Sequence, residues 1–444
     1  MNESKKWLII AHCFNMDGRA ASHTITDRIP ILMEKDVIPI VISAPTGKKD
    51  RRFLHYQVFS PAPSGFLFEM RHVIASRIRT KLMRVLLKFI LVLGLLPFLL
   101  IEKIFINLDS HWSWMFSATI KGWRVTRKNH PDLVYSSAGP SSTHVAGYLV
   151  SRLCGLPWLA EVHDPLIMDV QVKRYQRYRF HRWLEKLIFK NADGVVYFTE
   201  KALASAENRT KVLKKGYVIR PGARPSNKEI VGYTKRTKLH FGYFGSLTRK
   251  RNLSEFLEAM SLLKKENPMI AGHLVLDVFG ADLDPLSKCI LDQCALNEMV
   301  CLHGRIEYNP ITGKSGREQV FEEMHRCDVL LLVQGESTGR DEYIPSKIYE
   351  YFLTCRPILG IVLQGSEAER LMKVGGHLVV NKGDSEGIFK ALKHLYRVWE
   401  DGEIPDIKHQ PPYTIEKAVG DLLRIGTELY KRKIDQFSNT SRVV

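Results

Sequence analysis

The chain has 444 residues, with 65 lysines and arginines against 47 aspartates and glutamates, so its formal net charge is +18. At roughly 100–200 residues per domain, this length predicts two or three domains, each able to bury a core. A hydrophobic fraction of 45% with 25% charged residues excludes a disordered chain, a fibrous repeat and a polytopic membrane protein. The seven cysteines include no CxxC pair, and the N-terminus shows no secretory signal pattern. We therefore expect an intracellular protein without a disulfide framework or a zinc ribbon.

Short apolar runs alternate with helical patterns along the chain. In the first half the runs are Trp7–Ala11, Val37–Ser43, Leu133–Ser136, Trp158–Val162 and Val195–Phe198. In the second half they are Leu239–Phe244, Leu274–Phe279, Val300–His303, Val329–Val333, Ile358–Val362 and Leu378–Val380. Strand–helix alternation of this kind predicts parallel sheets with helices on both faces. The fold class is therefore α/β, with two Rossmann-like, doubly wound domains that face a central cleft.

The domain boundaries follow from the change in pattern near Arg220–Thr234, a polar segment with two prolines and two glycines. We expect a first domain at residues 1–222 and a second at residues 236–396. A proline-rich connector and C-terminal helices complete the chain at residues 397–444.

One segment, at about residues 70–106, does not fit a plain α/β domain. From Met70 to Ile101 there is no acidic residue, and Phe89–Ile101 is an uncharged apolar run. Four cations fall at helical spacing on one stripe, with an apolar stripe beside them: Arg77, Lys81, Arg84 and Lys88. This pattern is typical of a helix lying in a membrane interface, so we expect contact with an anionic membrane surface. The alternative is a pair of helices buried on the first sheet.

Ligands of doubly wound domains bind at the carboxyl ends of the strands, so we expect functional residues in the loops that follow strands. Asp17, Gly18 and Arg19 follow the first strand, where a glycine allows close approach and a helix start favours an anion. His163 and Asp164 follow the strand Trp158–Val162. The histidine could bond a substrate hydroxyl and the aspartate could orient it; a purely structural pair is the alternative.

The second domain opens with a strand, Gly245, and the cations Arg249, Lys250 and Arg251, followed by a helix start near Ser254. That combination suits a diphosphate, because glycine permits close approach and cations neutralise charge. Further on, Pro345 and Ser346 predict another helix start, with Lys347 on its first turn. Two carboxylates flank this start, and they could hold the hydroxyls of an extended ligand: Glu342 and Glu350.

Taken in order, these segments resemble the bacterial glycosyltransferases of family 4. The resemblance covers most of residues 130–385. It rests on Ser136–Pro165, Ala192–Thr199 (ADGVVYFT), Val218–Gly222 (VIRPG), Gly242–Leu253, His303–Gly304 and Ile344–Leu353 (IPSKIYEYFL). It implies the GT-B architecture, with the donor in the C-terminal domain and the acceptor in the N-terminal one. It also implies retention of anomeric configuration without a bound metal or other cofactor.

The resemblance also assigns roles to individual residues. It places Gly245 and Arg251 at the donor diphosphate, Glu350 at the donor ribose, and Glu342 and His163 at the reacting sugar. Three features depart from the family pattern. Ser246 stands where an arginine is frequent, which leaves that role to Arg249 or Lys250, and Tyr343–Lys347 replace a glycine-rich stretch. The N-terminal loop at Asp17–Arg19 lacks the usual pair of glycines.

The sequence thus predicts a retaining, metal-independent hexosyltransferase at the cytoplasmic face of the membrane. It would move a sugar from a nucleotide-diphosphate sugar to a lipid-linked or oligosaccharide acceptor, as in polysaccharide, lipopolysaccharide or capsule synthesis. Two alternatives stay open: a nucleotide-sugar 2-epimerase of the same fold, and a non-enzymatic basic protein that binds membranes or nucleic acid. No recognisable nucleic-acid motif is present, so nucleic acid is not an expected partner.

Overall fold

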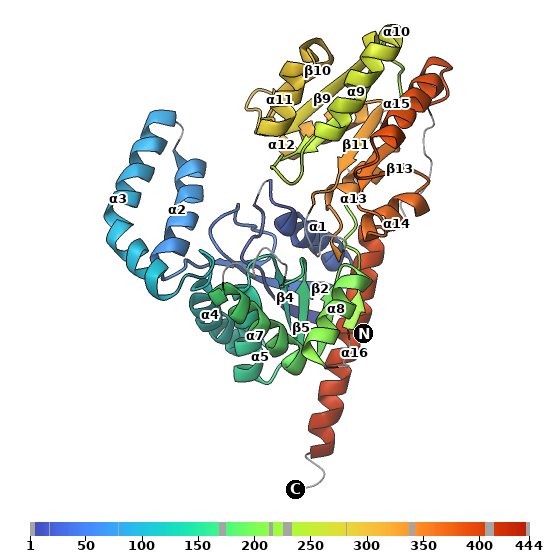
Figure 1. Cartoon of the computed structure of the whole chain (residues 1–444). Helices are drawn as coiled ribbons and strands as arrows, with labels where there is room; N and C mark the ends of the chain where they lie inside the picture. Colours follow the sequence, from blue (N-terminus) through green and yellow to red (C-terminus); the bar gives the residue numbers. More distant parts are fainter. Residues whose placement is uncertain are drawn as a thin grey trace. The chain divides into compact units, whose positions relative to one another are not determined.

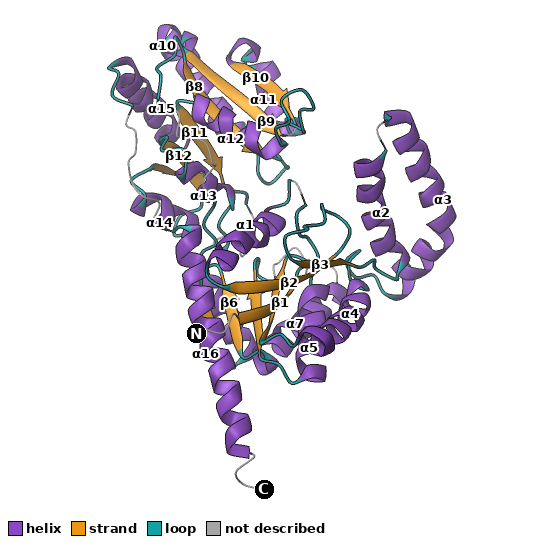
Figure 2. Ribbon diagram, turned by 180° about the vertical axis from the view of Figure 1, so that it is seen from behind, coloured by secondary structure: helices purple, strands orange, loops and turns teal. Residues whose placement is uncertain are grey.

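The computed structural model describes residues 5–16, 18–78, 80–167, 175–212, 216–224, 233–280, 282–336, 342–404 and 413–440. The chain forms two compact units: Met1–Pro221 together with Ile415–Val444, and Gly222–Thr414. Each unit is a parallel sheet with helices on its faces (Figures 1 and 2). The α/β class predicted from strand–helix alternation is confirmed.

The sheet of the first unit has the order β3-β2-β1-β4-β5-β6-β7, and all its strand pairs are parallel. The strands are β1 (Lys5–Ile10), β2 (Val37–Ser43), β3 (Leu54–Gln57), β4 (Leu133–Ala138), β5 (Trp158–Val162), β6 (Gly194–Tyr197) and β7 (Gly216–Val218). Five of them match predicted apolar runs. The two edge strands, β3 and β7, were not predicted, because only one of their residues is fully buried and neither has an unbroken apolar run.

Helices cover both faces of this sheet and seal a core on each. One core joins the strands to α4 (Trp114–Asn129), α5 (Ser142–Cys154), α7 (Tyr175–Asn191) and α8 (Glu200–Thr210). The other joins them to α1 (Ala20–Glu34) and α16 (Ile415–Thr440). Fully buried strands explain the continuous apolar runs in the sequence, since both faces of each strand meet a helix.

The sheet of the second unit has the order β10-β9-β8-β11-β12-β13 and is also parallel. Its strands are β8 (Leu239–Gly245), β9 (Leu274–Gly280), β10 (Val300–Gly304), β11 (Val329–Val333), β12 (Ile358–Val362) and β13 (Leu378–Asn381). Its helices are α9 (Ser254–Glu266), α10 (Pro268–Gly272), α11 (Pro285–Gln293), α12 (Gly316–Arg326), α13 (Lys347–Phe352), α14 (Glu367–Val374) and α15 (Ser385–Glu400), with a 3-10 turn at Asn297–Met299. All six strands were predicted, each to within two residues.

The segment predicted as one basic helical stripe is a hairpin of two helices. The first helix, α2 (Pro63–Arg77), ends at the first of the four cations, and α3 (Lys81–Phe105) begins at the second. The single stripe was therefore wrong, because Arg77 and Lys81 stand on different helices. Gly94 and Pro97 do not interrupt α3, which runs for 25 residues. Figures 1 and 2 show α3 on the outer side of α2.

The last helix, α16, belongs to the first unit although 193 residues of the second unit, Gly222–Thr414, precede it in the chain. Its apolar side enters the core around Trp7 through six buried residues: Ile415, Ala418, Val419, Leu422, Ile425 and Leu429. We expected residues 397–444 to form a separate connector with C-terminal helices. The structure divides them between the units, because residues 397–400 complete α15 of the second unit and α16 belongs to the first.

Two glycines of α16 give a matched test of this packing. A Cβ on Gly426 would lie 2.5 Å from the Trp7 ring, whereas a Cβ on Gly420 meets nothing within 4 Å. We expect Gly426→Ala to lower the free energy of unfolding of the first unit by about 1–3 kcal/mol through overpacking. Gly420→Ala should raise it by up to about 1 kcal/mol, because alanine is the better helix former. Denaturant unfolding checks both, and equal effects would contradict the docking of α16.

Candidate functional site

Two neighbouring strands of the first unit end in a buried polar network. Glu161 is the fourth residue of β5, and His163 follows that strand. Because side chains two apart in a strand share a face, both point the same way. Ser137 of β4 connects them: its hydroxyl donates to Glu161 Oε2 at 2.8 Å, and its oxygen lies 2.8 Å from His163 Nε2. The predicted His163 therefore stands in a fixed position at the carboxyl end of the sheet.

Beneath His163, a fully buried arginine holds the Glu161 carboxylate. Arg28 of α1 forms an ion pair with Glu161, and the Tyr135 hydroxyl donates to Glu161 Oε2 at 2.6 Å. Burial by itself would raise the pKa of Glu161, but the charge of Arg28 and the hydrogen bond from His163 outweigh it and hold the pKa well below its usual range. The network thus keeps a negative charge next to His163.

The His163 side chain is buried, with 8% of the residue exposed. Its ring stacks on Phe198 at 4.9 Å between centroids, and Nδ1 has no hydrogen-bond partner among the described residues. A buried ring nitrogen without a partner loses free energy that a ligand hydroxyl would restore. Asp164 comes next in the chain and is exposed. Of the predicted pair, His163 is thus buried and Asp164 lies at the surface.

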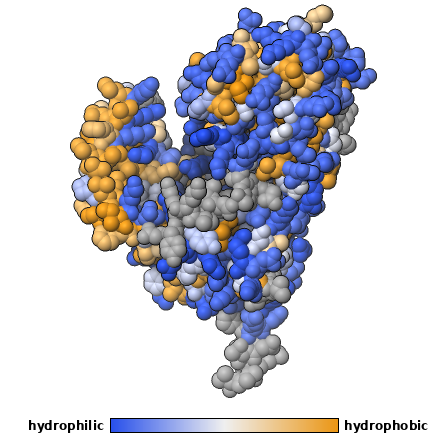
Figure 3. Space-filling model, in the orientation of Figure 1, coloured by the Kyte–Doolittle hydropathy of each residue, from blue (hydrophilic) through white to orange (hydrophobic). Residues whose placement is uncertain are grey.

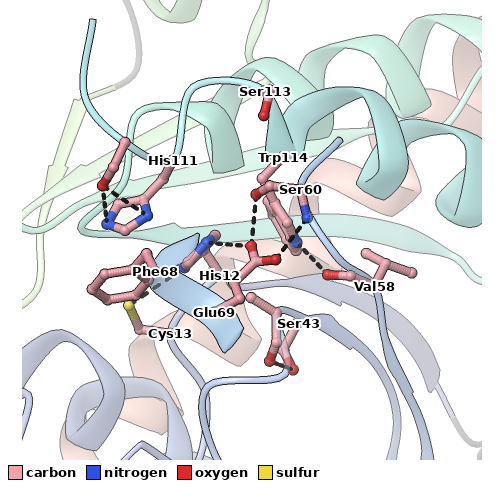
Figure 4. A network of polar contacts seen from close by, with 12 residues as sticks. His12, Cys13, Ser43, Val58, Ser60, Phe68, Glu69, His111, Ser113 and Trp114 are labelled. Atoms are coloured by element: carbon pink, nitrogen blue, oxygen red, sulfur yellow. Dashed lines mark hydrogen bonds and ion pairs between the residues drawn. The ribbon is translucent and has the colours of Figure 1, made fainter. Parts of the chain in front are cut away.

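A second polar cluster lies where β1 ends, and Figure 4 shows it from close by. His12 is fully buried there, with Nε2 at 3.4 Å from the Glu69 carboxylate of α2. Glu69 also accepts two hydrogen bonds from Ser60, at 2.7 Å from its amide and 2.6 Å from its hydroxyl. The ring of His111 lies 4.5 Å from that of His12. This cluster attaches the α2–α3 hairpin to the end of β1.

Burial sets the protonation of these groups. It raises the pKa of Glu69 to about 7, against the lowering effect of the Ser60 hydrogen bonds. Burial and the nearby Arg19 lower the pKa of His12 to about 3, and burial with His12 and Arg19 lowers that of His111 to about 2. Both histidines are therefore neutral at pH 7. Glu69 is close to half-ionised at that pH, so the cluster holds at most one negative charge.

The predicted loop after β1 adjoins this cluster. Arg19 lies over the Phe68 ring at 5.6 Å, and Gly18 has a φ of 70°. That backbone conformation is costly for other residues, which explains the glycine. Asp17 lies outside the described residues. Of the predicted set, the structure thus places Arg19 close to His12, gives Gly18 its left-handed backbone, and does not describe Asp17.

In the second unit, Gly245 and Lys347 are in contact at the end of β8. A Cβ on Gly245 would fall 2.0 Å from Lys347 Nζ, and the glycine has a φ of 138°. The Lys347 ammonium donates to the Phe244 carbonyl at the same place. Burial lowers the pKa of Lys347 to about 8, partly offset by the nearby Glu350. Lys347 is therefore largely protonated at pH 7, and Gly245 leaves room for it.

The three predicted cations after β8 form a tight turn. Thr248 and Arg251 exchange two backbone hydrogen bonds of 2.9 Å, which puts Arg249 and Lys250 at the exposed tip. The Arg251 guanidinium folds back and donates to the Ser246 carbonyl at 2.8 Å. Arg251 also contributes to the electrostatic environment of Lys347. Gly245, Arg251 and Lys347 thus share one positively charged corner.

Of the predicted acidic pair, Glu350 lies near this corner, since its charge acts on Lys347. Glu350 stands on α13 and forms an ion pair with Arg317 of α12, with 3.0 Å between Nε and Oε1. Glu342 is half-buried in the loop before α13. The predicted helix start is confirmed, because Ser346 occupies the N-cap position of α13, although its side chain makes no capping hydrogen bond.

Sequence reasoning missed three groups of site residues. Arg28 and Arg317 reach their carboxylates from helices remote in sequence, and no local pattern marks them. The third group, the cluster of His12 and Glu69, had one available signal, since His12 follows a buried strand as His163 does. Among the described residues, no group of three or more histidine, cysteine or acidic side chains is arranged to hold a metal ion.

The two sheets and their strand-end sites define the class of fold. The chain has the two-domain, Rossmann-like architecture of the GT-B glycosyltransferases. No protein-family model matches the sequence. The predicted assignment to family 4 therefore stays a prediction.

Comparison with known proteins gives particular relatives. The chain is 26% identical over 282 residues to the "Probable glycosyltransferase WbjE" of Pseudomonas aeruginosa, and this match spans 59% of the chain and 65% of that relative's length. Among solved structures, Anabaena HepE in complex with UDP and glucose is 14% identical, with a TM-score of 0.52, covering 99% of this chain and 100% of that one.

Two other solved structures share the fold. S. aureus TarM, in complex with fondaparinux, alpha-GlcNAc-glycerol and UDP, is 10% identical with a TM-score of 0.59, covering 95% of this chain and 99% of that one. The α,α-trehalose 6-phosphate synthase of Burkholderia multivorans is 10% identical with a TM-score of 0.56, covering 96% and 99%. At these identities the structural likeness supports the fold alone.

The buried histidines of the first unit predict acid sensitivity. His144, hydrogen-bonded to Ser136 at 3.0 Å, has its pKa lowered to about 3 by burial and by the nearby His163. A depressed pKa gives stability that is present above the unfolded value of 6.5 and is lost as the pH falls below it. Between pH 7 and pH 5, this loss is about 2 kcal/mol per histidine.

His144→Gln should therefore flatten the decline of unfolding free energy between pH 7 and pH 5 by that amount. His394→Gln, at an exposed position of α15, is the control and should leave the decline as in the parent. Denaturant unfolding at each pH is the measurement. Parallel declines in parent and His144→Gln would show that His144 is not held neutral.

Proposed function

We propose that the protein is a retaining glycosyltransferase that uses a nucleotide-diphosphate sugar. The observation that supports this most directly is the corner formed by Gly245, Arg251 and Lys347, which matches the chemistry of a diphosphate. Because Gly245 has no side chain, the Lys347 ammonium lies directly against the end of β8. Two cations stand beside it, and two more occupy the adjacent turn. The likeness to WbjE and the fold shared with UDP-bound structures support the same proposal.

In this proposal the second unit binds the donor and stabilises the leaving nucleotide. As the bond from the anomeric carbon to the diphosphate breaks, negative charge grows on the phosphate oxygens. Arg251 and Lys347 are positioned in advance to stabilise that charge, which is the electrostatic strategy that lowers a barrier most. The proposed reaction is metal-independent, because protein cations would do the work that a metal ion does elsewhere.

The first unit would bind the acceptor and the reacting sugar. His163 has a ring nitrogen without a hydrogen-bond partner among the described residues, and Ser137 connects it to the negatively charged Glu161. Such a charge favours the positive character that develops at an anomeric carbon in glycosyl transfer. We further propose a lipid-linked or oligosaccharide acceptor and a hexose donor, with the enzyme bound peripherally to the cytoplasmic face of the membrane.

A panel of nucleotide sugars tests the proposal. We expect one nucleotide-diphosphate sugar to protect the protein against thermal unfolding and to be slowly hydrolysed, equally well with a chelator present. Arg251→Ala should weaken its affinity about 10–100-fold, since an ionised contact to phosphate contributes about 1.5–3 kcal/mol. The matched control is Arg397→Ala, at an exposed position of α15. Absence of protection by every nucleotide sugar would refute the proposed function.

Glu342 provides a separate test of the chemistry. A carboxylate that acts mainly in the transition state affects kcat more than donor affinity. We expect Glu342→Gln to reduce kcat about 100-fold, as the loss of comparable electrostatic groups does. Glu350→Gln should instead weaken nucleotide binding. Near-normal turnover of Glu342→Gln at saturating donor would remove Glu342 from the site without touching the proposed function.

A further inference from the structure

The outer face of α3 is an extended apolar surface without charge. None of the 25 residues of α3 is fully buried. All thirteen exposed positions between residues 82 and 101 are apolar: Leu82, Met83, Val85, Leu86, Phe89, Ile90, Leu93, Gly94, Leu96, Pro97, Phe98, Leu100 and Ile101. At 1.5 Å per residue these positions extend over about 30 Å. In Figure 3 this surface is the orange area on the outer side of the hairpin.

The cations of α3 avoid this face. Arg84 and Lys88 are half-buried on the side that packs against α2, and the Arg84 side chain donates to the Ile78 carbonyl. Lys81 and Lys103 are exposed only at the two ends. At 100° per residue, the exposed apolar positions occupy more than half of the helix circumference. Of the four cations expected on one stripe, Arg84 and Lys88 therefore face α2 and do not lie beside the exposed apolar face.

A lipid bilayer fits this surface better than a protein groove does. A docking partner of ordinary size recognises a narrow stripe of a helix, whereas the apolar sector here is wide and unbroken. Gly94 and Pro97 lie within that sector, and both are more frequent in membrane helices than in soluble ones. Cations but no acidic residue occupy the segment from Met70 to Ile101, which matches an anionic surface.

The start of α2 and the end of α3 lie together at the base of the hairpin. At its base, Ser64 and Trp112 both donate to the Glu102 carboxylate, at 2.9 Å from the Ser64 amide and 2.6 Å from the indole nitrogen. By length and composition alone, α3 could cross a membrane. However, α2 would have to cross as well, and its 15 residues extend only about 22 Å against a hydrocarbon core of roughly 30 Å. It also carries Glu69, which is buried against His12.

We propose that α3 lies parallel to the membrane with its outer face in the acyl layer of an anionic bilayer, and that α2 stays on the aqueous side. One cation of α7 lies close to the end of α3, because Arg177 donates to the Leu108 carbonyl at 2.9 Å. Glu69 links α2 to the end of β1, so membrane docking sets the height of the strand-end site above the lipid. This inference extends the proposed function, because a site held close to the lipid would act on an acceptor that is anchored in the membrane. The docking itself does not depend on sugar transfer.

Vesicle flotation with phosphatidylglycerol and phosphatidylethanolamine tests the docking face. We expect the full-length protein to float with these vesicles. Replacing three outer-face residues by glutamine, Phe89→Gln, Leu93→Gln and Ile101→Gln, should reduce the partition coefficient at least about 100-fold, given the free energy of burying such side chains. The matched control replaces equally exposed apolar residues of the second unit, Met269→Gln, Leu302→Gln and Ile311→Gln, and should float as the parent does.

Two conditions keep the result interpretable. The substituted positions of α3 are exposed, so both triple variants should melt as the parent protein does. High salt should weaken binding but not abolish it, because apolar burial is not screened as charge is. Equal flotation of the two triple variants, or complete release by salt alone, would overturn the proposal.

Two other arrangements have distinct outcomes. If two copies cover the surface instead, lipid-free protein will sediment as a dimer that the α3 triple variant converts to a monomer, and vesicles will not bind. If the hairpin crosses the bilayer, a cysteine placed near its tip by Ser76→Cys will resist an impermeant maleimide until the vesicles are opened, as read on the peptide that contains residue 76. Either result overturns the parallel arrangement; prompt labelling of Ser76→Cys on intact vesicles supports it.

Discussion

The ion pair between Arg28 and Glu161 is the interaction on which the first unit depends. Both partners are completely buried, where separating a charge from water costs several kcal/mol unless the geometry compensates. Here Tyr135 and Ser137 donate hydrogen bonds to one carboxylate oxygen of Glu161, and Arg28 pairs with the other. Such a pair contributes little net stability, but it fixes α1, β4 and β5 in one arrangement. That arrangement also fixes the position of His163, which contacts Ser137 at the end of β4.

The site of the second unit depends on a missing side chain, at Gly245, and not on a buried ion pair. Lys347 can approach the β8 carboxyl end only because Gly245 has no side chain. The positively charged corner is formed by three short segments: the end of β8, the tight turn that follows it, and the start of α13. The nearby carboxylate of Glu350 is paired with Arg317 and only partly offsets the effect of burial on the pKa of Lys347. The two units thus reach strand-end sites by different physical means.

The sequence predicted most of the fold because buried parallel strands leave continuous apolar runs. It located His163, Gly245, Arg251 and Lys347 correctly at strand or helix ends, since that placement depends on local order alone. It could not find Arg28, Glu69 or Arg317, whose roles come from packing between segments far apart in the chain. It also interpreted Arg77 to Lys88 as one helical stripe, because no glycine or proline in the sequence between Arg77 and Lys81 marks the end of α2 and the start of α3.

The return of α16 to the first unit affects the order in which the chain can fold. The second unit, Gly222–Thr414, is inserted between two parts of the first. During synthesis the second unit is complete before α16 leaves the ribosome, so it can fold while the first still exposes the apolar surface around Trp7 that α16 covers. Domains usually fold from the N-terminus onward as they emerge. In this protein the N-terminal unit finishes last, and truncation anywhere before residue 415 leaves it without part of its core.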